Sequence, residues 1–248
     1  MKLEGKRILI TGGGSGMGLE LARRLAGANE VVIAGRDETK LERAHAETPR
    51  LRTLRLDVTS EEDARVVIDW LSSELGGLDV LVNNAGVMHR GMLARSNGPD
   101  AEVDINFGGT VRMTRLSLPL LEASPEAAVI FMSSGLALGA VPGLAVYSAT
   151  KAAVRSLARS LRAELAGTTV QIFEVLPPVV DTDLERGVDV PKVAPSKVVD
   201  AILAGVARER HEIAVREISP LRWVARLSPR LADLLVLRAV GGFERPAS

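Results

Sequence analysis

A tyrosine and a lysine lie four residues apart in the segment 147–151, within a stretch whose pattern is helical. At that spacing the two side chains share one face of a helix. An unperturbed phenol titrates at about 10, too high for efficient proton exchange at neutral pH. An ammonium about 5 Å away, at an effective dielectric constant of about 20, favours the phenolate by roughly 3 kcal/mol, or about two pKa units. We therefore expect Lys151 to lower the pKa of Tyr147, which could then act as a general acid or base.

Ser134 could take part in the same chemistry, because it precedes Tyr147 by 13 residues and follows an apolar run that predicts a strand. Its hydroxyl could polarise a substrate carbonyl as negative charge develops on the oxygen. Its neighbour Ser133 could substitute for it, and a serine in this place can also be only a turn or cap residue. Tyr147 is the only tyrosine of the chain, and aromatic residues make up 3% of the sequence, so core packing is a poor explanation for it.

A glycine-rich turn near the N-terminus has the composition of a phosphate-binding loop. It runs Thr11-Gly-Gly-Gly-Ser-Gly-Met-Gly18 between a predicted strand and a predicted helix. Glycines allow a tight turn and a close approach of the backbone to a pyrophosphate. The free N–H groups and the positive end of the helix then favour the anion. The cofactor-binding residues expected here are Gly12, Gly14, Ser15, Gly16, Met17 and Gly18.

Together these motifs resemble the short-chain dehydrogenase/reductase family, with matching positions between residues 11 and 182. The spacing T-G-x-x-x-G-x-G, the sequence Asn-Asn-Ala-Gly at 83–86 and Tyr-x-x-x-Lys at 147–151 keep the order of the family's motifs. The segments TGGGSGMGLELA and FEVLPPVVDTD are similar to its DltE-like branch. The resemblance implies a Rossmann fold, a nicotinamide cofactor and hydride transfer to or from a carbonyl or secondary alcohol.

The resemblance also implies roles for single residues. Asp57 and Val58 would hold the adenine ring, and Lys151 would hydrogen-bond the nicotinamide ribose. Asn106 would hold a water of the proton relay, although a mid-helix asparagine can also simply face solvent. It precedes the pair Gly108-Gly109, and each helical glycine costs about 1 kcal/mol relative to alanine, so close packing or a local break is expected there. The remaining cofactor contacts expected after strands are Asn83, Ala85, Gly86, Pro177, Val180 and Thr182.

The residue after the second predicted strand bears on the choice between NAD and NADP. Gly35 stands where a dinucleotide-binding fold usually has an acid for the ribose hydroxyls, and Arg36 follows it. A guanidinium matches the geometry of a 2′-phosphate, so NADP(H) is favoured over NAD(H). The alternative is a surface arginine paired with Asp37 or Glu38.

The segment after the sixth predicted strand departs from the family pattern. It has Pro177-Pro178 where the family usually has Pro-Gly, and Pro178 loses both the φ freedom of glycine and an N–H group. Thr182 still falls where the family's threonine meets the carboxamide. We expect residues 183–195 to begin a substrate lid, and 183–248 to form the lid and a C-terminal extension.

Strand-like and helical segments alternate along the chain, which predicts a single-domain α/β Rossmann fold, a doubly wound parallel sheet of about seven strands flanked by helices. Most strand candidates are continuous Val- and Ile-rich runs, as in strands buried on both faces. Ser60 with Asp63 predicts the start of a helix near residue 60. The predicted strands are Arg7–Thr11, Glu30–Gly35, Arg52–Asp57, Val80–Asn83, Ala128–Ser133, Thr169–Leu176 and Glu212–Val215.

The composition bounds the remaining classes of function. Lys+Arg and Asp+Glu both number 31 in 248 residues, so no overall charge favours nucleic acid. Cysteine is absent, which excludes disulfides and thiolate metal sites, and His45, His89 and His211 have no metal-ligand spacing. No signal peptide or membrane-spanning run is recognised, so we expect a soluble cytoplasmic protein.

The apolar tail 220–240 carries four arginines. It is expected to be a subunit contact or a helix covering the pocket, with a membrane-surface element as the alternative. Apolar residues in the loops predict a hydrophobic carbonyl substrate; they are Met88, Met92, Leu136, Leu138 and Val141. Family members are commonly dimers or tetramers, so a homodimer or homotetramer is expected. The alternative to an NADP(H)-dependent oxidoreductase is a non-catalytic NADP(H)-binding regulatory protein on the same fold.

Overall fold

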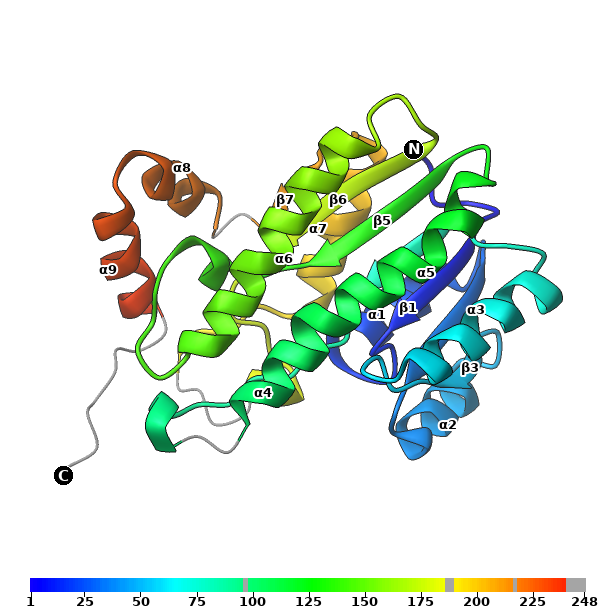
Figure 1. The fold of residues 1–248 in the computed structure, drawn as a ribbon, viewed down its shortest axis with the longest axis horizontal. Helices are drawn as coiled ribbons and strands as arrows, with labels where there is room; N and C mark the ends of the chain where they lie inside the picture. The colour runs from blue at the N-terminus through cyan, green and yellow to red at the C-terminus, as the bar shows by residue number, and fades with distance from the viewer. Residues whose placement is uncertain (96–97, 186–189, 216–217, 240–248) are drawn as a thin grey trace.

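Parallel strands form one sheet at the centre of the computed structural model, which describes residues 1–95, 98–185, 190–215 and 218–239 (Figure 1). In these residues the sheet has seven strands in the order β3-β2-β1-β4-β5-β6-β7. The strands are β1 Arg7–Thr11, β2 Glu30–Gly35, β3 Arg52–Arg55, β4 Val80–Asn83, β5 Ala127–Met132, β6 Val170–Leu176 and β7 Glu212–Ala214. The predicted fold class is confirmed, and β1, β2 and β4 begin and end at the predicted residues.

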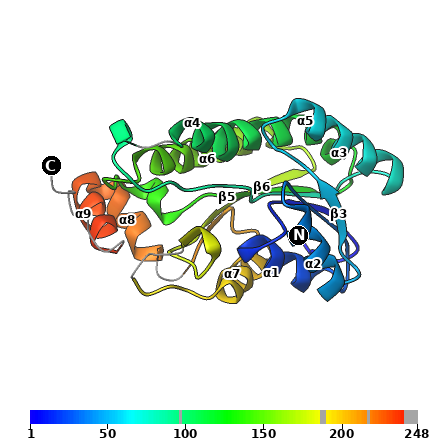
Figure 2. The ribbon, with the colours of Figure 1, turned by 90° about the horizontal axis from the view of Figure 1, so that it is seen from below.

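Helices cover both faces of the sheet, as Figure 2 shows, with α3, α4, α5 and α6 on one side and α1, α2 and α7 on the other. The longer helices are α1 Gly16–Leu25, α2 Glu38–Glu47, α3 Glu61–Glu74, α5 Thr110–Glu122, α6 Ala145–Glu164, α7 Pro195–Ala207, α8 Ser219–Leu227 and α9 Pro229–Ala239. The short ones are η1 Leu93–Arg95, α4 Pro99–Glu102, η2 Val103–Gly109, η3 Gly135–Leu138 and η4 Asp183–Glu185. None of these described helices is long and apolar enough to cross a membrane.

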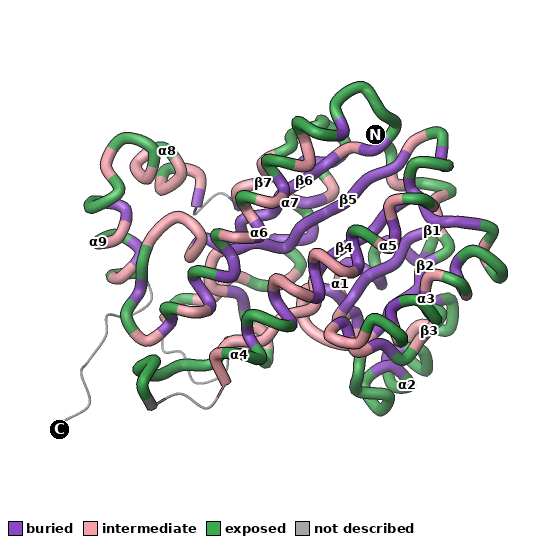
Figure 3. Tube along the Cα trace, in the orientation of Figure 1, coloured by how far each residue is buried: buried purple, intermediate pink, exposed green. Residues whose placement is uncertain are grey.

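The two faces of the sheet form two separate hydrophobic cores, because side chains alternate along each strand. In β1, Ile8 and Ile10 pack toward α1 and α7, whereas Leu9 packs toward α3, α5 and α6. Figure 3 shows the central strands buried almost throughout, while the helices alternate between buried and exposed positions; the edge strand β3 has no buried residue. The predicted helix start at Ser60 is also present, since its Oγ accepts a hydrogen bond from the N–H of Asp63 at 3.1 Å.

An ion pair joins the beginnings of β1 and β4. Asp79 is buried, and its Oδ2 accepts hydrogen bonds from Arg7 N at 2.8 Å and Arg7 Nε at 2.9 Å. Its Oδ1 accepts from Arg7 Nη2 at 2.6 Å and from Ser124 Oγ at 2.7 Å. Burial opposes the charge, but these hydrogen bonds prevail and lower the pKa of Asp79 to about 2. The pair joins the amino-terminal ends of β1 and β4, at the end of the sheet opposite the glycine-rich turn.

Candidate active site

The glycine-rich turn between β1 and α1 is shaped by close backbone contacts. Gly12 and Gly16 have φ of +65° and +55°, which L side chains rarely adopt. A Cβ on Gly12 would lie 2.8 Å from Ala85 Cα, and one on Gly18 would lie 2.5 Å from Asn84 Nδ2. Ser15, at the start of α1, makes no capping hydrogen bond with its side chain, so the first N–H groups of α1 remain for an anion. The turn therefore fits a pyrophosphate.

Asn84 holds this turn against the end of β4, a role that the sequence analysis missed. Its Nδ2 donates to Thr11 O at 2.9 Å and to Gly12 O at 3.0 Å. Its backbone N–H donates to Thr11 Oγ1 at 3.0 Å, and that of Ala85 donates to the same oxygen at 3.1 Å. The only feature of the sequence that could have indicated this role is the pair of adjacent asparagines at 83–84.

One cavity brings most of the predicted site residues together at the carboxyl edge of the sheet. Its volume is about 190 Å³. The predicted residues that line it are Gly12, Ser15, Gly16, Met17, Ala85, Gly86, Ser134, Tyr147, Lys151, Pro177, Val180 and Thr182. The glycine turn, the tyrosine and the segment after β6 thus share one space, although 136 positions separate residues 11 and 147 in the sequence.

Several predicted residues lie outside this cavity. Asn83 is buried and its Nδ2 donates to Thr114 Oγ1 at 2.9 Å, so its side chain faces the α5 layer. Gly14 packs against α2, where an added Cβ would lie 3.2 Å from Lys40 Cβ. Val58 packs against Gly109, where an added Cβ would lie 2.6 Å from Val58 Cγ2.

Arg36 and Asp57 lie beside each other at the ends of β2 and β3. Arg36 Nη1 is 4.0 Å from Asp57 Oδ2, and the Arg36 side chain is 56% exposed. Asp37 instead caps α2 by accepting from Lys40 N at 3.1 Å. Burial works against the charge of Asp57, but hydrogen bonds from Thr59, assisted by Arg36, lower its pKa. Arg36 is therefore poised at the surface with Asp57, rather than with Asp37, as its neighbour.

Tyr147 and Ser134 meet inside the cavity. Both side chains are buried, and the Ser134 hydroxyl lies close enough to the phenol to lower its pKa. Ser134 Oγ also accepts from Leu136 N at 3.1 Å, so it caps η3 as well as contacting the phenol. Ser133 points elsewhere, because its Oγ donates to Lys151 O at 3.1 Å. The geometry thus favours Ser134 over Ser133 as the partner of Tyr147.

The expectation that Lys151 lowers the pKa of Tyr147 is wrong for this structure. Burial raises the pKa of Tyr147, the carboxylates of Glu185 and Glu102 raise it further, and only the Ser134 hydrogen bond lowers it. The ammonium lies 5.7 Å from the phenol ring centroid and donates to Met132 O at 2.9 Å. The cost of burying a phenolate exceeds the attraction of this ammonium. Burial also lowers the pKa of Lys151, to about 8.

Asn106 lies in η2, a π-helix, where the predicted helix is interrupted as the two glycines indicated. Its Nδ2 donates to Val87 O at 2.9 Å and its Oδ1 accepts from Val87 N at 2.8 Å. Nδ2 also lies 3.2 Å from Thr150 Oγ1. Asn106 therefore ties the segment after β4 to α6, one turn from Tyr147.

Two buried carboxylates raise the pKa of the phenol, and the sequence analysis missed both. Glu185 lines the cavity, and its Oε2 lies 3.5 Å from Arg90 Nη2. Glu102 Oε1 accepts from His89 N at 2.6 Å. Burial raises the pKa of both carboxyl groups, and the adjacent Arg90 opposes this for Glu185. The residues beside Glu102 and Glu185 in the sequence did not indicate a role at the site, because only the fold brings these carboxylates near Tyr147.

A larger cavity of about 570 Å³ adjoins the first, and Ser134, Pro177, Pro178 and Glu185 line both. Its further lining includes Leu136, Val179, Ile218, Leu221 and Val236. Of the apolar loop residues expected there, Leu136 lines it, whereas Met92 is 41% exposed. Residues 186–189 of the expected lid lie outside the described residues.

Comparison with known proteins assigns the chain to a family. Residues 6–191 match the model of the short chain dehydrogenase family. The chain is 35% identical over 239 residues to the uncharacterised oxidoreductase DltE of Bacillus subtilis, covering 91% of this chain and 94% of that protein.

Two solved structures of short-chain dehydrogenases and reductases are similar to this chain along most of its length. A short-chain dehydrogenase of Burkholderia cenocepacia in complex with NADP is 28% identical with a TM-score of 0.85, covering 96% of this chain and 99% of that one. A 3-ketoacyl-(acyl-carrier-protein) reductase of Brucella melitensis complexed with NADH is also 28% identical, with a TM-score of 0.78, covering 86% of this chain and 98% of that one.

Proposed function

Because this chain belongs to the short chain dehydrogenase family, we propose that it transfers a hydride between NADP(H) and a carbonyl or secondary alcohol, with Tyr147 as general acid and base. The observation that carries the proposal is one shared cavity, in which Tyr147, Ser134 and Lys151 face the glycine turn. A bound nicotinamide supplies the hydride. The glycine turn and α1 would hold the pyrophosphate, and Thr182, near Gly16, would meet the nicotinamide end.

The environment of Tyr147 supports reduction of a carbonyl. A phenol whose pKa is raised by burial keeps its proton at neutral pH. It can therefore donate that proton to the substrate oxygen as negative charge develops there. Ser134, which lines the same cavity as the phenol, would orient the same oxygen. Lys151, with its pKa lowered to about 8, stays mostly charged at neutral pH and would stabilise the phenolate left behind.

Arg36 supports the preference for NADP(H). Gly35 ends β2 where an acidic residue is usual, and the exposed guanidinium of Arg36, which follows it, can bind a phosphate. Since the related structures contain NADP in one case and NADH in the other, the preference depends on this chain's own residues. Arg36→Ala should weaken binding of NADPH at least tenfold while changing that of NADH little. An unchanged ratio of the two dissociation constants would refute the phosphate role.

The adjoining cavity supports a hydrophobic substrate. Its apolar residues, which share the wall with Arg90, Lys192, Lys197 and Arg238, and its volume of about 570 Å³ suit a compound with a sizeable hydrocarbon part, whose carbonyl would lie near Ser134. NADPH oxidation against a panel of ketones and aldehydes of increasing apolar size tests this. Activity only with small polar carbonyl compounds would contradict it.

Tyr147→Phe is the main test of the reaction. On an accepted substrate its kcat should fall at least 100-fold, because the substitution removes the phenolic proton donor beside Ser134. Ser148→Ala is the matched control, since Ser148 adjoins Tyr147 on α6 and its buried Oγ has no hydrogen-bond partner among the described residues. Full activity of Tyr147→Phe would refute the assignment. NADPH binding without turnover of any carbonyl compound would favour the regulatory alternative.

A further inference from the structure

The last two described helices, α8 and α9, form a hairpin that projects from one end of the molecule (Figure 1). Its inner side is well packed. Ala232 and Val236 of α9 are buried, and Asp233 Oδ1 accepts a hydrogen bond from Ala140 N at 2.8 Å. The hairpin is therefore held to the body of the protein through Ala232, Asp233 and Val236 of α9.

Both helices of the hairpin expose large apolar side chains, although Trp223 also lines a cavity between α8 and α6. On α9, Leu231, Leu234 and Leu235 are 45%, 44% and 37% exposed, at the i, i+3, i+4 spacing of one helix face. On α8, Trp223 and Leu227 are 58% and 85% exposed, one turn apart. These are five of the nine exposed large hydrophobic residues in the described part of the chain. Such a concentration marks a surface that binds something.

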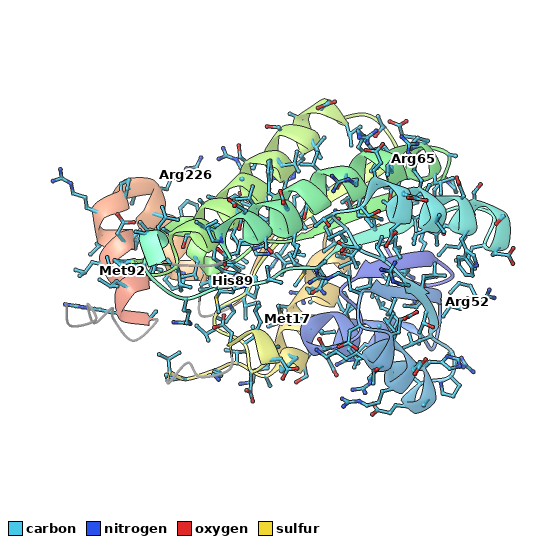
Figure 4. All side chains as sticks on the ribbon, turned by 60° about the horizontal axis from the view of Figure 1, so that its bottom comes forward. Met17, Arg52, Arg65, His89, Met92 and Arg226 are labelled. Atoms are coloured by element: carbon cyan, nitrogen blue, oxygen red, sulfur yellow. The ribbon has the colours of Figure 1, made fainter. Side chains whose placement is uncertain are left out.

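The charge of the hairpin indicates the partner. Four arginines and one acid lie on it: Arg222, Arg226, Arg230, Arg238 and Asp233. Arg222 pairs with Glu212 at 3.3 Å, whereas the other three arginines form no ion pair with any described residue. Figure 4 shows Arg226 at this end of the molecule, away from the sheet. Arg226 and Arg238 are exposed although each also lines a cavity beside the hairpin, and the one acid accepts from Ala140 N. The exposed charge of the hairpin is therefore cationic in a chain whose formal net charge is zero.

We infer that this hairpin docks on the surface of an anionic lipid bilayer. Tryptophan and leucine would enter the headgroup boundary, and the arginines would contact lipid phosphates, as in interfacial amphipathic helices. A second copy of the chain fits less well, because a two-fold contact would bring the two arginine-rich faces together. Helices of 9 and 11 residues are far too short to span the bilayer, so the attachment is to one surface.

Sedimentation of the full chain with vesicles tests the inference. We expect at least tenfold stronger partitioning onto phosphatidylglycerol–phosphatidylcholine vesicles than onto pure phosphatidylcholine, weakening as salt is added. The double variant Trp223→Ser/Leu227→Ser should lose at least tenfold. Arg226→Gln should lose about fivefold, the equivalent of about 1 kcal/mol for one charge near the surface.

Val66→Ser is the matched control, because Val66 is 63% exposed on α3, at the opposite end of the molecule in Figures 1 and 2. It should bind vesicles like the unmodified protein. Circular dichroism and NADPH binding establish that each variant is folded. Equal partitioning onto neutral and anionic vesicles, or unchanged partitioning of the double variant, would overturn the inference. Loss of an oligomer in the double variant, without vesicle binding by the unmodified protein, would assign the surface to a second copy. The measurement needs no substrate, so failure of the proposed reaction would not affect it.

Discussion

Replacing Asp79 with asparagine should reveal how much the ion pair between β1 and β4 stabilises the fold. The carboxylate accepts three hydrogen bonds from Arg7 and one from Ser124, and the substitution removes its charge while keeping its size. The pKa of Asp79 falls from 3.8 to about 2 in the folded protein. That difference corresponds to about 2 kcal/mol of folding free energy at neutral pH.

The sign of the pH dependence follows from the lowered pKa. The contribution of Asp79 is fully present above its unfolded pKa of 3.8 and is lost as the pH falls through about 2. At pH 7, Asp79→Asn should lower the free energy of unfolding by about 2 kcal/mol and the Tm by roughly 4–8 °C. At pH 3 the difference from the unmodified protein should shrink to about half.

Urea unfolding followed by circular dichroism at several pH values between 3 and 7 measures both quantities. Asp69→Asn is the control, because Asp69 is exposed on α3 and forms no hydrogen bond or ion pair with another described residue. It should leave the stability nearly unchanged at every pH. The reasoning fails if Asp79→Asn is as stable as the unmodified protein at pH 7, or if their difference stays constant down to pH 3.

Two further predictions concern the candidate active site. Gly18→Ala should weaken NADPH binding at least tenfold in a fluorescence titration, because the new Cβ would lie 2.5 Å from Asn84 Nδ2, whereas Gly27→Ala, with open space around the new Cβ, should bind normally; equal loss in both variants would contradict this. Glu185→Gln should lower the pKa of Tyr147, so the basic limb of the pH profile of kcat/KM for ketone reduction should move to lower pH, and an unmoved limb would exclude an electrostatic role for Glu185.

The strands could be predicted because their signal is local. A parallel strand covered on both faces is a short apolar run ending in glycine or a polar residue, as at the ends of β1 and β4. Tyr147, Ser134 and the glycine turn could also be predicted to lie together, since the carboxyl ends of parallel strands share one edge. Their convergence on one cavity agrees with that prediction.

The electrostatics around the phenol could not be predicted in the same way. Spacing along a helix shows that Lys151 is near Tyr147, but it does not show how completely both are removed from water. Glu185 and Arg90 are 95 positions apart, so only the folded chain shows that they pair beside the phenol. Similarly, the two glycines of η2 indicated a break, whereas the reason for Gly109 is its contact with Val58 on another segment.

The presence of one tyrosine in 248 residues makes the phenol spectroscopically unique. If the chain is produced with tyrosine carrying ¹³C at the ring carbon bonded to oxygen, its NMR spectrum should contain a single enriched resonance from a single buried group. The chemical shift of that resonance would report the ionisation of Tyr147 without any mutation, and the two tryptophans would not contribute to it. A titration with and without NADP⁺ would then measure directly how far the dinucleotide changes the acidity of this one hydroxyl.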